Sequence, residues 1–139
     1  MTATDVAPAA LQSAQQRLDD IGRRDQVSFL QQSLDEPWPP GPFDLMVLSE
    51  VGYYLAPEAL RSTLDREWPR LAAGATVVAA HWRHRVDDYL MTGDRVNEII
   101  AETAGFHSTA SYRDADVVID VFDTADGASV ATRTGVPID

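Results

Sequence analysis

The chain contains no cysteine and no lysine, since all eleven of its basic residues are arginines. Without cysteine it has no disulfide framework, thiol nucleophile or thiolate metal site, and the cytoplasm is the expected compartment. Without lysine, Schiff-base chemistry and a phosphate-loop lysine are excluded. No apolar run approaches the roughly 20 residues of a membrane span, and we expect no signal peptide because the N-terminus lacks the basic-then-apolar order.

Positive charge is also scarce, because 22 acidic residues against 11 basic ones give a formal net charge of −11. Such a surface repels phosphate backbones and anionic lipids. We therefore expect neither nucleic acid nor a membrane as partner, and a small molecule instead. The length of 139 residues predicts a single domain, residues 1–139.

Hydrophobic periodicity predicts an α/β domain of three layers, with a doubly wound sheet. Strands are expected at the first five residues and at 27–30, 43–48 and 75–81, and the last two are nearly all apolar, as in buried parallel strands. Helices are expected at 8–22, from 56 to a proline-induced end near 68, and at 92–105. An antiparallel hairpin (107–112 and 117–122) closes the domain, and 128–132 is a further short strand.

Each predicted helix has one apolar face, which we expect to pack on the sheet. The inward residues are Leu11, Ala14, Leu18 and Ile21 in the first helix, Leu60, Leu64, Trp68 and Leu71 in the second, and Val96, Ile99, Ile100 and Ala104 in the third.

Polar residues follow three of the predicted strands, where open α/β sheets bind their ligands. Asp5 ends the first strand and either binds ribose hydroxyls or caps the following helix. Glu50 follows the third strand with two tyrosines, and is either an acceptor for a ligand proton or a solvated loop acid. Thr92 is expected to cap the third helix.

His81 opens a local positive cluster, HWRHR at residues 81–85, at the end of the fourth strand. Such a cluster suits an anionic or carbonyl-bearing substrate, unless Asp87 and Asp88 merely neutralise it. His81 and His84 have no third ligand nearby, so we expect no metal.

These strings, in this order, resemble class I S-adenosylmethionine-dependent methyltransferases, and more narrowly the nodulation protein S family. The resemblance runs from Asp5 to about Phe122. It is carried by DVAPAAL at 5–11, FDLMVLSEV at 43–51, YYL at 53–55, HWR at 81–83, and DY and TGD at 88–89 and 92–94. The resemblance implies S-adenosylmethionine as cofactor and an antiparallel pair of final strands, like the predicted hairpin. In the named family the acceptor is the amine of a deacetylated chitin-type oligosaccharide.

The resemblance also implies roles for single residues. Cofactor-binding positions are Asp5, Ser33, Leu34, Ser49, Glu50 and Tyr54, and substrate-binding positions are Tyr53, His81, Trp82 and Arg83. Glu50 and His81 are the candidates for orienting or deprotonating the acceptor. The expected reaction is methyl transfer to a small polar acceptor, by N- or O-methylation, as on a sugar-type amine.

A glycine-rich first turn, expected upstream of an acid such as Asp5, is absent from this chain. We therefore expect a domain incomplete at its N-terminus, in which the missing strand would separate the first and third predicted strands. Two strand edges are then left open, and a homodimer is one way to cover them. Compromised catalysis is expected, and the alternative is a non-catalytic interaction or regulatory module derived from this fold. A nicotinamide enzyme is disfavoured by the hairpin and by the lack of lysine.

Overall fold

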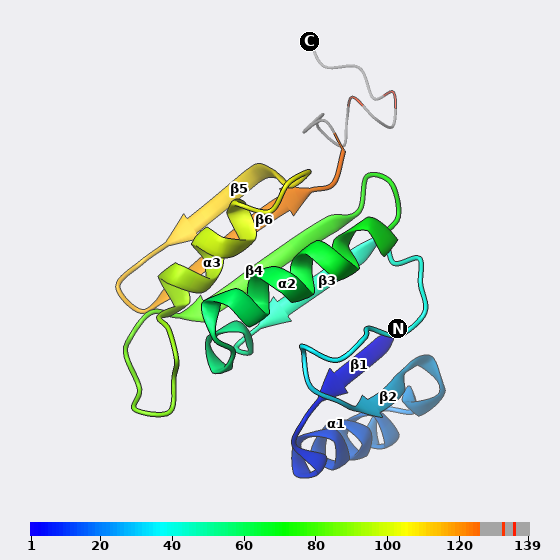
Figure 1. Ribbon diagram of the computed structural model, residues 1–139. Coiled ribbons are helices and arrows are strands. Elements are labelled where there is room, and N and C mark those ends of the chain that lie inside the picture. The colour runs from blue at the N-terminus through cyan, green and yellow to red at the C-terminus, as the bar shows by residue number, and fades with distance from the viewer. Residues whose placement is uncertain (126–131, 133–134, 136–139) are drawn as a thin grey trace. The chain divides into compact units, whose positions relative to one another are not determined.

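The computed structural model describes residues 1–125, 132 and 135, and the chain forms two compact units, Met1–Pro39 and Pro40–Asp139. Each unit contains its own sheet (Figure 1). The strand predicted at 128–132 lies outside the described residues, except for Thr132. That the chain is a single domain stays a prediction.

The first unit is a β-α-β element. Strands β1 (Thr2–Asp5) and β2 (Ser28–Gln31) pair in parallel, and α1 (Pro8–Asp20) with the short 3₁₀ helix η1 (Arg24–Gln26) connects them. Proline fits the first turn of α1, since its missing N–H has no partner there anyway. Gly22, just past the end of the helix, has φ +65°, which glycine adopts without steric cost.

The packing of α1 is carried by Leu11, which is buried, with Ala14 and Leu18 half-buried. The prediction that Ile21 also points inward is wrong, because its side chain is 68% exposed. The helix ends at Asp20, so Ile21 no longer follows the helical period.

The second unit contains a four-stranded sheet of order β3-β4-β6-β5. Its strands are β3 (Leu45–Ser49), β4 (Thr76–Trp82), β5 (His107–Arg113) and β6 (Val117–Asp123). The first two strands are parallel, while β6 is antiparallel to both of its neighbours. The predicted α/β class and closing hairpin are thereby confirmed. Among the described strands, β1 pairs only with β2, and β3 only with β4.

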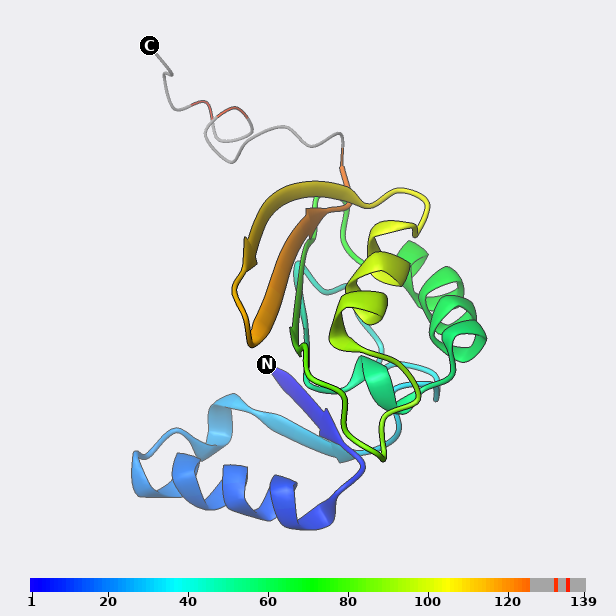
Figure 2. The same ribbon diagram turned by 90° about the vertical axis from the view of Figure 1, so that its left-hand side faces the viewer.

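Two helices cover one face of this sheet, α2 (Pro57–Glu67) and α3 (Gly93–Ala101) (Figure 2). The 3₁₀ helices η2 (Gly52–Tyr54) and η3 (Trp68–Arg70) precede and follow α2. The α-helix gives way to η3 where Pro69 removes a backbone donor, as predicted. The Thr92 side chain caps α3 by accepting the N–H of Arg95 at 3.2 Å. Ala104 lies beyond α3 and is exposed, so its predicted inward position is wrong.

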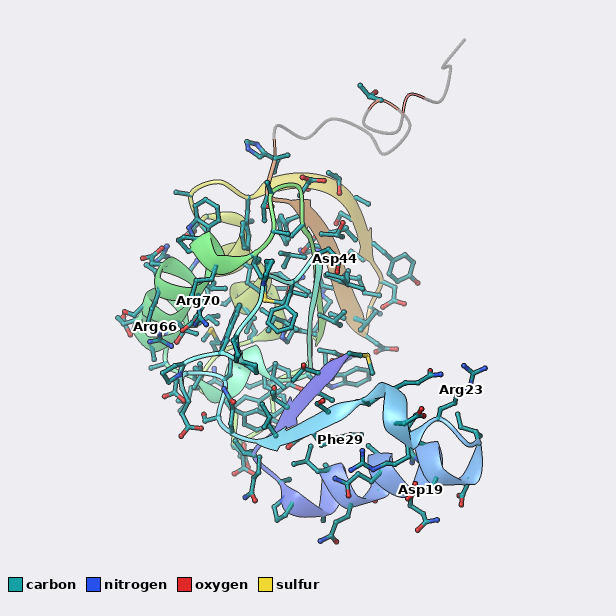
Figure 3. All side chains as sticks on the ribbon, turned by 90° about the vertical axis from the view of Figure 1, so that its right-hand side faces the viewer. Asp19, Arg23, Phe29, Asp44, Arg66 and Arg70 are labelled. Carbon is teal, nitrogen blue, oxygen red and sulfur yellow. The ribbon has the colours of Figure 1, made fainter. Side chains whose placement is uncertain are left out.

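The core of the second unit lies between these helices and the sheet. It contains Leu60, Leu64, Val77, Ala79, Val96, Ile99, Ile100, Val118 and Phe122. Glu67 is also buried, and it is paired with Arg66 and Arg70, both labelled in Figure 3. A buried carboxylate is tolerated only with such partners. On β3, by contrast, Leu45 and Val47 remain 55% and 56% exposed.

Candidate functional site

Glu50 lies directly after β3, where its backbone N–H still bonds to the carbonyl of Ala80 at 3.0 Å. Among the residues that the structure describes, Glu50 is the only non-glycine with a positive φ, 58°. A non-glycine residue in this region is strained, and such residues gather at functional sites. Its Oε1 accepts the backbone N–H of Trp82 at 2.8 Å, although Glu50 as a whole is exposed. The carboxylate therefore lies at the adjoining carboxyl ends of β3 and β4.

Tyr53 contacts this carboxylate. Its hydroxyl donates to Oε2 of Glu50, its side chain is buried, and its ring stacks on Tyr89 with centroids 3.7 Å apart. Burial and the hydrogen bonds to Glu50 and Tyr89 raise the pKa of Tyr53 above its usual range. Tyr53 thus keeps its proton and acts as a hydrogen-bond donor to Glu50. Tyr54, with its ring edge-on to Tyr53 and Tyr89, is exposed.

His81 lies near the end of β4, with its side chain fully buried between the sheet and α3. Its Nε2 accepts the N–H of Gly52 at 3.2 Å, and its Nδ1 lies 2.8 Å from Oδ1 of Asn97. Burial lowers the pKa of His81, although the Asn97 bond and the Glu50 charge oppose that shift. Because both ring nitrogens are engaged, this geometry favours a neutral imidazole that positions its neighbours over one that contacts substrate.

The next two residues face more open surroundings. Trp82 is 39% exposed and lies beside the ring of His84. The Arg83 side chain is held by two neighbours. Its Nε lies 3.1 Å from both carboxylate oxygens of Asp94, and its Nη1 donates to the carbonyl of Asp114.

Two members of the positive cluster bond to acids other than Asp87 and Asp88. Arg83 forms an ion pair with Asp94, and Nε2 of His84 lies 2.7 Å from Oδ1 of Asp116.

In the first unit, the candidate cofactor residues lie at the carboxyl ends of both strands. Asp5 ends β1, and its Oδ1 accepts the N–H of Ala7 at 2.8 Å. Asp5 thereby satisfies a backbone N–H at the start of α1, although the N-cap residue itself is Ala7, which makes no side-chain cap bond. Ser33 and Leu34 follow β2 in a turn, where the Ser33 N–H donates to Glu36 at 2.7 Å. Because β1 and β2 are parallel and adjacent, Asp5 and Ser33 come to the same edge.

The structure thus places Ser49, Glu50, Tyr53, Tyr54, His81, Trp82 and Arg83 at or after the carboxyl ends of β3 and β4 in the second unit, and Asp5, Ser33 and Leu34 at or after those of β1 and β2 in the first. Sequence reasoning missed the contributions of Asn97 and Asp120. One signal was available for Asp120, since it is the sole acid within the apolar run 117–122. A single polar residue at the centre of a buried strand predicts a buried partner.

Within the described part of the chain, no group of three or more His, Cys, Asp or Glu side chains is placed to hold a metal ion. None of the helices in that part of the chain has the length and apolarity that crossing a bilayer requires.

No protein-family model and no curated protein matches the chain. Several solved structures do match it. A Pseudomonas syringae protein assigned as a methyltransferase is 28% identical, with a TM-score of 0.69, over 88% of this chain and 71% of its own. N-methyltransferase NodS from Bradyrhizobium japonicum WM9 is 23% identical, with a TM-score of 0.72, over 90% and 73%. Its complex with S-adenosyl-L-homocysteine is 24% identical, with a TM-score of 0.70, over 88% and 65%.

The chain has the fold of a class I S-adenosylmethionine-dependent methyltransferase. It spans 65–73% of the length of these solved structures. In this methyltransferase fold Glu50 follows β3, and His81 lies near the carboxyl end of the adjacent parallel strand β4. The predicted resemblance is thereby confirmed at the level of the fold.

Proposed function

We propose that the chain belongs to an enzyme that transfers a methyl group from S-adenosylmethionine to a small polar acceptor. The observation that carries the proposal is the strained Glu50, whose carboxylate is held at the carboxyl ends of β3 and β4 in a methyltransferase fold. An amine is the proposed acceptor, because NodS, one of the matching structures, is an N-methyltransferase. Among amines we propose a sugar-type one, as the resemblance implies.

The residues of the first unit suit the adenosine part of the cofactor. Asp5 ends its strand with one carboxylate oxygen bonded to Ala7, and a carboxylate there accepts hydrogen bonds from ribose hydroxyls. Ser33 and Leu34, after the neighbouring strand, are proposed to contact the adenine. In the second unit, Ser49, Glu50 and Tyr54 are proposed as cofactor contacts. When bound, the cofactor supplies an electrophilic methyl group on a positively charged sulfur.

Glu50 is proposed to orient the acceptor and to receive its proton. An amine attacks through its lone pair, so a protonated amine must first lose a proton. Because Tyr53 and the Trp82 N–H hold both carboxylate oxygens, Glu50 keeps one orientation, which places a proton acceptor without further reorganisation. Catalysis of methyl transfer rests mainly on such positioning.

For the other candidates the contacts suggest different roles. His81 is proposed to position the Glu50 segment, because its ring nitrogens bond to Gly52 and Asn97. Trp82 is proposed to stack on the acceptor, since its ring remains partly exposed. Arg83 and Tyr53 are proposed to shape the acceptor side through their bonds to Asp94 and Glu50.

The test measures methyl transfer from labelled S-adenosylmethionine to a deacetylated chitin-type oligosaccharide and to hydroxylated sugars. Glu50→Gln is expected to lower kcat by roughly 100-fold, the lower end for loss of a general base. The matched control is Glu58→Gln, an exposed acid in the first turn of α2. Titration with S-adenosylhomocysteine separates a binding defect from a chemical one. Unchanged kcat in Glu50→Gln would remove the proposed role of Glu50, and no cofactor binding by the unsubstituted chain would count against the enzyme itself.

A second candidate is a non-catalytic interaction module, and the exposed Leu45 and Val47 on β3 favour it. Among the described strands β3 pairs only with β4, and an unpaired apolar edge is a template for another chain. We propose a homodimer that covers this edge. Sedimentation velocity of the chain and of Val47→Lys tests this homodimer. A dimer that forms through β3 would dissociate in the variant.

A further inference from the structure

Three buried or part-buried polar side chains meet between α3 and the sheet of the second unit. They come from different elements, His81 from β4, Asn97 from α3 and Asp120 from β6. His81 and Asn97 are 0% and 2% exposed. Buried polar groups cost stability unless each is hydrogen-bonded, and a fully bonded set fixes one arrangement.

The two groups at the ends of this chain of hydrogen bonds, the Gly52 N–H and the Asp120 carboxylate, determine the direction of every bond between them. At one end the Gly52 N–H can only donate, so Nε2 of His81 must accept. At the other end the Asp120 carboxylate accepts from Nδ2 of Asn97 at 2.7 Å, and the Ala79 carbonyl accepts from the same amide at 3.4 Å. The Asn97 oxygen therefore faces His81, and Nδ1 of His81 carries the proton.

We propose that Asn97 and Asp120 are positioning residues, which hold His81 in the tautomer that accepts the Gly52 N–H and thereby hold the turn containing Glu50 and Tyr53. The inference deepens the proposed function, because it rests on Glu50 being the group that meets the acceptor. Neither Asn97 nor Asp120 has to touch cofactor or substrate.

Close packing at the same point supports this role. A Cβ on Gly52 would lie 2.3 Å from Cγ1 of Val96 and 3.2 Å from Nε2 of His81. The backbone at Gly52 is thus pressed against the imidazole and α3, and real Cβ atoms do not approach so closely. A displaced imidazole would move this turn, whose next residue is the Tyr53 that bonds to Glu50.

The set also makes the turn sensitive to the charge of His81. A protonated ring has donors at both nitrogens, so Nε2 would face the Gly52 N–H donor to donor. The groups that face His81 are Glu50 and the Tyr53 ring from the β3–α2 segment, neutral Asn97 from α3, and Asp120 of β6 behind Asn97. Burial lowers the pKa of His81 and so keeps the ring neutral.

The test exchanges the amide and the carboxylate. Asn97→Asp alone places two carboxylates against each other, whereas Asn97→Asp combined with Asp120→Asn restores one donor between them. The combined variant also brings a negative charge directly to Nδ1 of His81, which raises the pKa of that ring. The matched control is Asp116→Asn, which removes the acid beside the exposed His84.

Two readouts use nuclear magnetic resonance and need no activity: the ¹⁵N shifts of the His81 ring, and hydrogen exchange at the Gly52 amide. We expect the Nδ1-protonated tautomer in the unsubstituted chain. In Asn97→Asp we expect Gly52 exchange to be roughly tenfold faster, the equivalent of one hydrogen bond, with restoration in the combined variant. The combined variant should also charge His81 at a higher pH than the unsubstituted chain.

Unchanged exchange at Gly52 in Asn97→Asp, or an Nε2-protonated His81 in the unsubstituted chain, would overturn the proposal. If Asn97→Asp does not fold, the combined variant alone decides through the Gly52 amide at a pH where His81 is neutral: exchange at the unsubstituted rate supports the proposal, and faster exchange overturns it. With an active enzyme, kcat should fall in Asn97→Asp and recover in the combined variant. Absence of methyl transfer from the unsubstituted chain would count against the proposed function and leave the two resonance readouts valid.

Discussion

Glu50 and Trp82 join the ends of two parallel strands, through the hydrogen bond from the Trp82 N–H to Oε1 of Glu50 at 2.8 Å. The left-handed backbone of Glu50 costs on the order of 1–3 kcal/mol. A hydrogen bond to a charged group contributes about 1.5–3 kcal/mol, and this carboxylate accepts two, the second from Tyr53. The bonds therefore offset the strain, and the carboxylate stays at the strand ends.

The first prediction concerns the strain at Glu50. Glu50→Ala and Glu50→Gly both remove the carboxylate, but only alanine keeps a Cβ at φ 58°. We expect the glycine variant to be more stable than the alanine variant by about 1 kcal/mol, measured by urea unfolding. At Glu58 in α2 the order should reverse, because glycine disfavours a helix by about 1 kcal/mol. An alanine variant at position 50 that equals or exceeds the glycine variant would contradict the assignment of strain.

The second prediction concerns the cap of α3. Thr92→Ala removes the acceptor of the Arg95 N–H and should lower the free energy of unfolding by about 1 kcal/mol. Thr92→Ser keeps the hydroxyl oxygen and should remain close to the unsubstituted chain. Equal loss in both variants would mean that packing of the threonine methyl group, and not capping, stabilises this helix.

The third prediction concerns the close contact between α3 and β4. A Cβ on Gly93 would lie 2.2 Å from the Trp82 carbonyl oxygen and 2.8 Å from Cβ of His81. Gly93→Ala should therefore destabilise the fold by about 1–3 kcal/mol, as overpacking does. In an unobstructed helix the same change stabilises by up to about 1 kcal/mol, so a gain in the unfolding midpoint would show that the two elements do not approach this closely.

The fourth prediction is a pH dependence that arises from His81. Burial lowers its pKa in the folded chain, while the unfolded chain has the ordinary value of about 6.5. As the pH falls below about 6.5, the unfolded state takes up a proton that the folded state does not, so stability falls until the folded pKa is reached. Above that window His81 adds no pH dependence.

The free energy of unfolding is measured by urea denaturation at several pH values between 7.5 and 5, for the unsubstituted chain and for His81→Gln. The unsubstituted chain should lose stability more steeply below about pH 6.5, by at most about 1.4 kcal/mol per pH unit. Parallel curves would show that His81 titrates alike in the folded and unfolded chains.

The sequence by itself determined the elements, because their signals are local. The apolar runs 43–48 and 75–81 became β3 and β4, Pro69 ended α2, and Thr92 capped α3. Backbone propensity, proline geometry and capping depend on residues that lie close together in the sequence. Helices and strands can therefore be predicted from the sequence alone.

Only the tertiary structure decided what the polar residues do. His81 is covered and bonded to Asn97, which lies 16 residues further along the chain and in turn bonds to Asp120 on another strand. Packing of α3 against the sheet brings these groups together and excludes water from them, and that decides which ring nitrogen carries the proton. The sequence places a histidine at a strand end, but burial and partners, which depend on distant residues, determine its charge and its role.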